Sequence, residues 1–87
     1  MLKHLTSAQI RAARALLRWS AQDLADHSAV GVTTIRRAEL TEFETSMTKA
    51  NDLAVRRVLE NAGIEFIDEN GGGTGVRFRK RQRPKNK

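Results

Sequence analysis

Cysteine is absent from the 87 residues, and no apolar run approaches the length that spans a membrane. Without cysteine, neither a disulfide nor a thiolate metal site can support a small domain, so a core must come from helix packing or from a partner chain. The N-terminus lacks the features of a signal peptide. We therefore expect one small cytoplasmic domain with no membrane segment.

Residue sets that perform catalysis are missing as well. The sequence shows no paired carboxylates and no nucleophile with its base, and His4 and His27 each stand without nearby cysteine, histidine or a carboxylate cluster. The glycine loop at 70–74 lacks the lysine of a Walker loop and the strand–turn–helix context of a dinucleotide site, which favours a hairpin turn. We expect no enzyme activity, no cofactor, no metal and no small-molecule ligand.

Positive charge is concentrated at one end of the chain. The net charge is +6, yet residues 77–87 hold seven Lys or Arg and no acid, while the remainder holds nine basic against ten acidic side chains. Residues 80–87, KRQRPKNK, are too polar to fold and predict a disordered tail. Such a tail either attracts phosphate or enters a minor groove, or it only adds solubility, and salt dependence separates these alternatives.

The stretch 20–40 predicts two short helices joined by a tight turn. Ser20 suits an N-cap, and Asp23 stands where its carboxylate can reach back to the cap nitrogen. We expect one helix at 21–28 and a second at 32–40, packed through Leu24, Ala25, Ile35 and Ala38. This is the arrangement of a helix-turn-helix, in which the first helix braces the second against a DNA groove.

A longer pattern points to a family. Ser20, Leu24-Ala25, Val30, Ile35 and Glu39 occur without a gap, between the flanks RAARALLRWS and VRRVLENAGIEFIDENGGG. Together they resemble the XRE-like class of bacterial regulators, the phage repressor and Cro type. The resemblance implies a mainly α fold with a four-helix, phage-repressor-like helix-turn-helix domain at 1–63, a β-hairpin at 64–79 and the basic tail at 80–87.

The same resemblance implies a function. We expect a sequence-specific regulator of transcription that binds double-stranded DNA. It is most simply a bacterial repressor, found in the cytoplasm and on the nucleoid when bound. In this family an arginine at the position of Arg14 pairs with the acid that ends the second helix of the motif, which implies a partly buried Arg14–Glu39 ion pair. From the residues alone, Arg14 could equally belong to a solvated face with Arg11 and Arg18.

The turn departs from the family pattern. Ala29 stands where glycine is usual, and Ser28 stands where an apolar residue is usual. A left-handed backbone at Ala29 would cost about 1 kcal/mol or more, so the turn is either remodelled or strained. The family's glutamines at the starts of the two helices are Ala21 and Val32 here, which removes two expected polar contacts.

The outer face of the helix at 32–40 carries the residues expected to contact DNA. Arginine can donate two hydrogen bonds to guanine O6 and N7, threonine can meet a base edge or a phosphate, and valine or threonine methyls suit a thymine methyl. The predicted base contacts are Val32, Thr33, Thr34, Arg36 and Arg37, and the predicted phosphate contacts are Ser20, Gln22, Thr33 and Lys49. The alternative is that the two arginines are only solvated.

Two further helices are expected to complete the helical domain. A capping box of Thr6 and Gln9 predicts a helix at 7–18. Thr48 predicts the start of a helix that ends near residue 62, before a C-cap glycine, with Arg56 and Arg57 solvated. The apolar stripe of the first of these helices is Ile10, Ala13, Leu16 and Leu17.

Residues 64–69 and 75–79 predict the two strands of the hairpin, and in the second of them Val76 and Phe78 alternate with Arg77 and Arg79. Two strands alone are marginal in water, so the hairpin must lean on the last helix or pair with another chain. We expect a homodimer formed through Ile64, Phe66, Ile67, Val76 and Phe78. A two-fold dimer would place two DNA-reading helices about 34 Å apart on an inverted repeat.

A different class of function stays open. The protein could be an antitoxin or an accessory module that binds another regulatory protein, with DNA binding secondary. The hairpin would then be the partner surface, and binding that survives nuclease treatment would distinguish this alternative.

Overall fold

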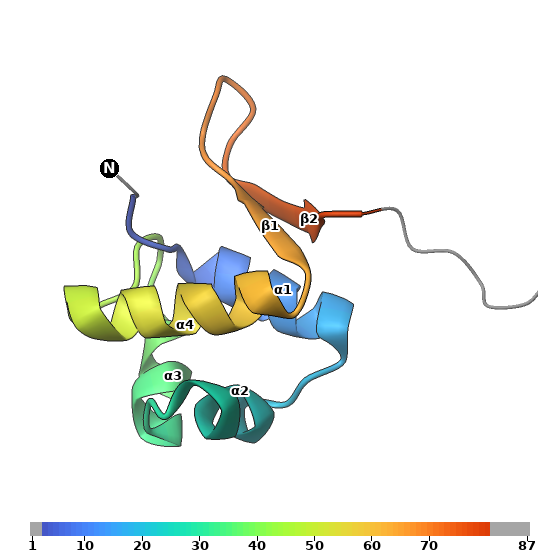
Figure 1. The fold of residues 1–87 in the computed structure, drawn as a ribbon. Helices are drawn as coiled ribbons and strands as arrows, with labels where there is room; N and C mark the ends of the chain where they lie inside the picture. The colour runs from blue at the N-terminus through green and yellow to red at the C-terminus, as the bar shows by residue number, and fades with distance from the viewer. Residues whose placement is uncertain (1–2, 81–87) are drawn as a thin grey trace, which may run out of the picture.

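Four helices and a two-stranded antiparallel hairpin make up the chain in the computed structural model, which describes residues 3–80 (Figure 1). In chain order the elements are α1 (Ser7–Leu17), α2 (Ala21–Ser28), α3 (Val32–Ala38), α4 (Lys49–Asn61), β1 (Ile64–Ile67) and β2 (Gly75–Phe78). The expected mainly helical architecture followed by a hairpin is therefore present. Most of the predicted tail, 81–87, lies outside the described residues.

Helix starts follow the capping residues of the sequence. Thr6 and Ser20 each form a full capping box with the residue three positions on, and the Thr48 hydroxyl accepts the Asn51 N–H. These side chains satisfy amides that have no partner inside the helix. The predicted bounds of α2 are confirmed, and those of α1 and α4 differ by one residue at the C-terminus.

The predicted end of α3 at Leu40 is wrong. The helix ends at Ala38, because the N–H of Leu40 bonds to the carbonyl of Arg37 at 3.1 Å in a tighter, three-residue turn. Both strands are also shorter than predicted, ending at Ile67 and Phe78. With seven residues, α3 has about two turns, and this length still gives it one exposed face.

One hydrophobic cluster joins all the helices and the first strand. Its fully buried large side chains include Ile10 of α1, Leu24 of α2, Ile35 of α3, Leu59 of α4 and Ile64 of β1. Leu16, predicted in the apolar stripe of α1, is 38% exposed, so that placement is wrong. The stripe runs through Ile10 and Ala13, while Leu17 packs at the margin of the core.

The segment before α1 is tied to α4. Leu5 is completely buried, and its N–H donates to Asp52 Oδ1 at 3.0 Å. The expectation that Arg56 is solvated is wrong. It is 4% exposed, donates from Nη2 to the Lys3 carbonyl at 2.6 Å and lies over the Phe66 ring, 5.2 Å from the centroid. Arg57 is exposed as expected.

The hairpin packs against both α1 and α4. Register pairs Ile64 with Phe78 and Phe66 with Val76. The buried Gln9 side chain of α1 donates from Nε2 to the carbonyls of Ile67 at 3.2 Å and Gly75 at 3.1 Å. In Figure 1 the hairpin rises on one side of the helices, and α2 and α3 lie on the opposite side. Across residues 3–80, no helix has the length and apolarity to cross a membrane.

Candidate nucleic-acid interface

The connection between α2 and α3 holds the two helices in a fixed relation. Ala29 ends α2 with φ 61° and ψ 17°, so the backbone is left-handed there and the strained alternative for the turn is the one observed. Ser28 stands where an apolar residue was usual, and its Oγ accepts the Val30 N–H at 3.2 Å. Val30 is then buried, and Gly31 precedes the first turn of α3.

The outer face of α3 is open to solvent. Ile35 and Ala38 are buried against α2 and the core, whereas Thr33, Arg36 and Arg37 are exposed. Within residues 3–80, none of the three has a hydrogen bond or ion pair from its side chain. Their donors are therefore available to an external acceptor.

The other two predicted base contacts are less accessible. Val32 is half-buried and packs against the core, because a side chain in the first turn leans back toward the helix start. Thr34 is half-buried and lines a shallow hollow of about 230 Å³ with Arg37 and residues at the start of α4. Those residues, not foreseen from the sequence, are Ser46, Met47, Thr48 and Asn51.

Three of the predicted phosphate contacts lie on helix starts. Ser20 caps α2, and its oxygen accepts the Asp23 N–H at 3.0 Å while its O–H can still donate outward. Gln22 is exposed but donates to Asp26 Oδ1 at 2.9 Å. Lys49 is the exposed first residue of α4, beside the hollow that α3 and α4 share. Thr33 lies on the exposed face of α3.

An ion pair connects α1 to the end of α3, as predicted. Arg14 donates from Nε to Glu39 Oε2 at 2.6 Å and from Nη2 to Oε1 at 2.7 Å, and from Nη1 to the Trp19 carbonyl at 2.9 Å. The side chains of Arg14 and Glu39 are 21% and 9% exposed. The hydrogen bond with Glu39 raises the pKa of Arg14 above its ordinary value. The pair fixes the C-terminal end of α3 relative to α1.

Ile64 is not available for the predicted dimer contact. It is 0% exposed because its side chain fills the core of its own chain, so its assignment to an interface is wrong. The remaining four are half-buried: Phe66, Ile67, Val76 and Phe78. Of these, Phe66, Val76 and Phe78 pack at the edge of the core. They keep part of their apolar surface in solvent.

Sequence reasoning missed two exposed apolar side chains after α3. Leu40 is 82% exposed and Phe43 is 55% exposed, beside the exposed acids Glu42 and Glu44. The only feature of the sequence that pointed to this loop as a distinct surface was its acidic content.

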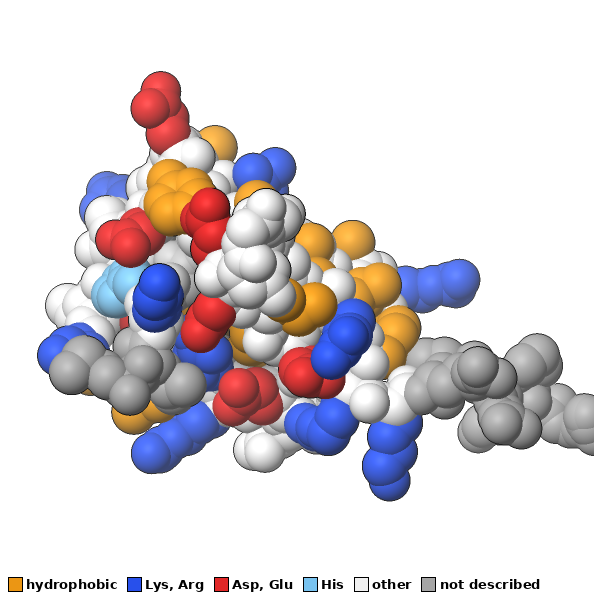
Figure 2. Space-filling model, turned by 90° about the horizontal axis from the view of Figure 1, so that it is seen from above, with side chains coloured by type: hydrophobic (Ala, Val, Ile, Leu, Met, Phe, Trp, Pro, Cys, Tyr) orange, Lys and Arg blue, Asp and Glu red, His pale blue; other side chains and the backbone are white. Residues whose placement is uncertain are grey.

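Figure 2, viewed from the hairpin side, shows basic and acidic side chains intermixed over the face opposite α2 and α3.

Neither histidine lies in a metal-binding group. Across residues 3–80, no three side chains of His, Cys, Asp or Glu are close enough together to hold an ion. His4 Nε2 lies 3.0 Å from the Met47 carbonyl and 3.7 Å from Asp52 Oδ1. These contacts add to those that hold the segment before α1 against α4. His27 is exposed, and its ring lies against Trp19 in a tilted arrangement with the centroids 4.4 Å apart.

Comparison with known proteins adds no relative. No protein-family model matches the chain, and no curated protein matches it significantly.

Proposed function

We propose that this protein is a sequence-specific, double-stranded DNA-binding regulator of the XRE-like, phage repressor type, acting most simply as a repressor. In this proposal α2, the turn and α3 form a helix-turn-helix, and α3 enters the major groove. The observation that carries the proposal is the exposed face of α3, where Thr33, Arg36 and Arg37 have no partner within residues 3–80.

The size of α3 sets how much sequence it can read. Seven residues at 1.5 Å per residue extend about 10 Å, or roughly three base pairs. Two arginines on one face supply bidentate donors for guanine, and Thr33 suits either a base edge or a phosphate. Val32 and Thr34 are half-buried, so we propose that they make only van der Waals contacts, such as with a thymine methyl, at the edge of the DNA site.

Phosphate contacts would position the helix. The Ser20 hydroxyl and the Lys49 ammonium stand at the starts of α2 and α4, where backbone N–H groups favour an anion. The Arg14–Glu39 pair keeps the acid of α3 neutralised and turned toward α1 instead of toward phosphate. These contacts would give affinity and register, while Arg36 and Arg37 would give specificity.

We further propose a homodimer formed through the hairpin. The half-buried apolar side chains of β1 and β2 are Phe66, Ile67, Val76 and Phe78. The hairpin and α3 lie on opposite sides of the helices in Figure 1, so one copy can use both surfaces at once. Sedimentation that finds only monomer at micromolar concentration, with and without DNA, would remove this part of the proposal.

Selection from a pool of random DNA duplexes tests the function. The expected result is an enriched short site, arranged as an inverted repeat if the protein dimerises. Arg37→Ala should then cost about 1–3 kcal/mol on that site and relax preference at one base position. Arg57→Ala removes the same charge from an exposed position of α4 and should leave the preference unchanged. A pool that shows no enrichment would overturn sequence-specific binding.

A second candidate function is supported by a separate observation. Leu40 and Phe43, exposed between α3 and α4 next to Glu42 and Glu44, suit a protein partner with a basic, apolar surface. This would make the chain an antitoxin or accessory module. Capture of one specific partner that survives nuclease treatment and is lost in Leu40→Ser/Phe43→Ser would favour it over the DNA-binding proposal.

A further inference from the structure

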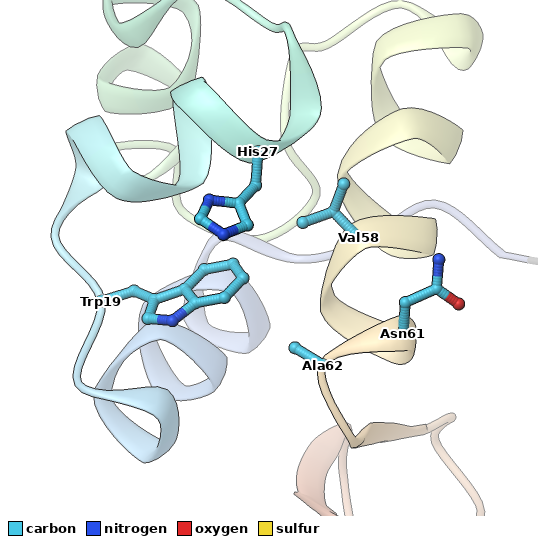
Figure 3. A pocket seen from close by; sticks show the side chains of 5 residues that line it. All are labelled: Trp19, His27, Val58, Asn61 and Ala62. Carbon is cyan, nitrogen blue, oxygen red and sulfur yellow. The ribbon is translucent and has the colours of Figure 1, made fainter.

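A hollow of about 420 Å³ opens between α2 and the end of α4 (Figure 3). It is lined by Trp19, His27, Val58, Asn61 and Ala62. Figure 3 shows the rings of Trp19 and His27 facing each other, Val58 and Ala62 directed toward them from α4, and the Asn61 amide turned away. The volume lies in the range of small-molecule sites, and the hollow is shallow and open to solvent, so it can cover only one side of a ligand.

The hydrogen bonding of His27 decides what the hollow can recognise. Its Nδ1 lies 3.0 Å from the Asp23 carbonyl. Because a carbonyl oxygen only accepts, Nδ1 must be the nitrogen that carries hydrogen in the neutral ring. Nε2 then holds a lone pair, and Figure 3 shows this nitrogen on the side of the ring that faces Trp19. Within residues 3–80 no group donates to it.

The walls favour a flat, neutral ligand. The Trp19 and His27 rings are tilted by 35°, so they present aromatic faces and edges for stacking, and the α4 side contributes aliphatic carbon. The hollow also lies at the C-terminal ends of α2 and α4, where the partial charge of the helix is negative and disfavours an anion. An acceptor nitrogen within an apolar, aromatic wall therefore suits a ring that carries a donor.

The hollow is connected to α3 by a short chain of contacts. The Trp19 carbonyl accepts from Arg14 Nη1 at 2.9 Å, and the same guanidinium binds both oxygens of Glu39, the C-cap of α3. A ligand that shifts Trp19 therefore acts on the group that positions the end of α3. The contact with Arg14 is made by the Trp19 backbone carbonyl and not by its ring, so a ligand affects α3 only if it moves the backbone at Trp19.

We propose that this hollow binds a small, neutral aromatic molecule of one or two rings with an O–H or N–H that donates to His27 Nε2. Occupancy is transmitted to α3 through Trp19, Arg14 and Glu39. The proposal of a ligand site does not depend on whether the chain binds DNA. If the proposed function also holds, the ligand is an effector of DNA binding.

Phenol and toluene are matched probes, because they share a shape and differ in one donor. Titration of the full chain at pH 8, followed by NMR, should give saturable shifts at Trp19, His27, Val58 and Ala62. The dissociation constant of phenol is expected near the millimolar range. In His27→Phe, which keeps a ring but removes Nε2, the preference for phenol relative to toluene should fall about fivefold.

Two further variants test place and transmission. Ala62→Leu fills the hollow and should abolish saturation, whereas Ala15→Leu, on the exposed side of α1, should leave it intact. With phenol bound, the amides of residues 38–40 should also shift. No saturable shift at the hollow would overturn the site, and saturation without any shift at 38–40 would overturn the transmission. Shifts of the same resonances with protein concentration alone would show that a second copy occupies the hollow, which also overturns the ligand.

Discussion

Ala29 and Arg18 end their helices in a conformation that suits glycine. Their φ angles are 61° and 59°, and both residues are exposed. A side chain in left-handed backbone costs about 1–2 kcal/mol. The structure compensates at Ala29, where the N–H bonds to the Ala25 carbonyl at 2.9 Å and the next residue, Val30, is buried. The strain therefore persists because the core fixes both ends of the turn.

Replacing Ala29 with glycine should stabilise the protein. Ala29→Gly removes the Cβ strain, and the greater freedom of glycine in the unfolded chain offsets part of the gain, leaving about 0.5–1 kcal/mol. Urea denaturation measures the free energy of unfolding. Ala15→Gly is the matched control, because Ala15 is exposed inside α1 with ordinary helical backbone and should lose about 1 kcal/mol. Equal losses in both variants would show that Ala29 is not strained.

The Arg14–Glu39 pair should matter more to stability than its partly exposed position indicates. Arg14→Met leaves a carboxylate that is 9% exposed without its bidentate partner, and the expected loss is about 3 kcal/mol. Glu39→Gln should lose a similar amount. A double-mutant cycle by urea denaturation should return coupling of about 1–3 kcal/mol. Additive losses would mean that the two side chains act independently.

The hairpin pair of Glu65 and Arg77 is the exposed counterpart. Hydrogen bonding to Arg77 lowers the pKa of Glu65 below its ordinary value of 4.5. Because the folded pKa is the lower one, the pair stabilises the fold above about pH 4.5, and this contribution disappears as pH falls through the folded pKa. Both groups are exposed, so the effect is screened by salt and small.

Among the elements, the hairpin depends on one side chain of α1. Gln9 Nε2 donates to the carbonyls of Ile67 and Gly75, and Gln9 Oε1 accepts the Thr6 N–H at 3.1 Å. The two roles use different atoms of one amide. A carboxylate at this position keeps the acceptor of the capping box and removes the donor toward the strands.

Gln9→Glu should therefore release the hairpin while α1 keeps its start. Two strand carbonyls would face an oxygen instead of an N–H, at a cost of about 1–3 kcal/mol. Amide hydrogen exchange should speed up at 64–67 and 75–78. Thr6→Val, which removes the cap and leaves the strand contacts, should speed exchange at the start of α1 instead. Unchanged protection of the strands in Gln9→Glu would show that packing alone holds the hairpin.

The same division between local and distant contacts explains what the sequence predicts. Caps and apolar spacing located α2 to the residue, because both act within one or two turns. They also predicted that Arg36 and Arg37 face outward while Ile35 faces inward. The burial of Leu5 and Arg56 depends on contacts between residues about 50 positions apart, and no local pattern encodes those.

Partial burial was equally hard to foresee. Val32 belongs to the outer set by position, yet its side chain leans back onto the core. Ile64 alternates with the charged Glu65 like an interface residue, but it is the first strand residue after Gly63, whose φ of 108° redirects the chain at the end of α4, and its side chain is fully buried. The Arg14–Glu39 pair was predictable only through the family resemblance, since 25 residues separate its partners.

At the scale of the whole molecule, most of the excess positive charge lies at the C-terminal end of the chain, after the last strand. Residues 81–87, outside the described part, hold four of the sixteen Lys and Arg side chains and no acid. Without them the net charge falls from +6 to +2. If the proposed function holds, this segment adds electrostatic affinity, whereas α3 supplies the preference for sequence.

Deleting residues 81–87 should flatten the salt dependence of DNA binding. Each cation that neutralises a phosphate contributes about 0.9 to the slope of log affinity against log salt, so four contacts would reduce the slope by about 3–4. Changing the same four residues to glutamine keeps the length and should give the same slope, because charge and not chain length is the cause. The preferred site, which we propose that α3 selects, should stay unchanged in both variants. An unaltered slope would leave the segment as a solubilising tail, and a changed site preference would place it among the groups that read bases.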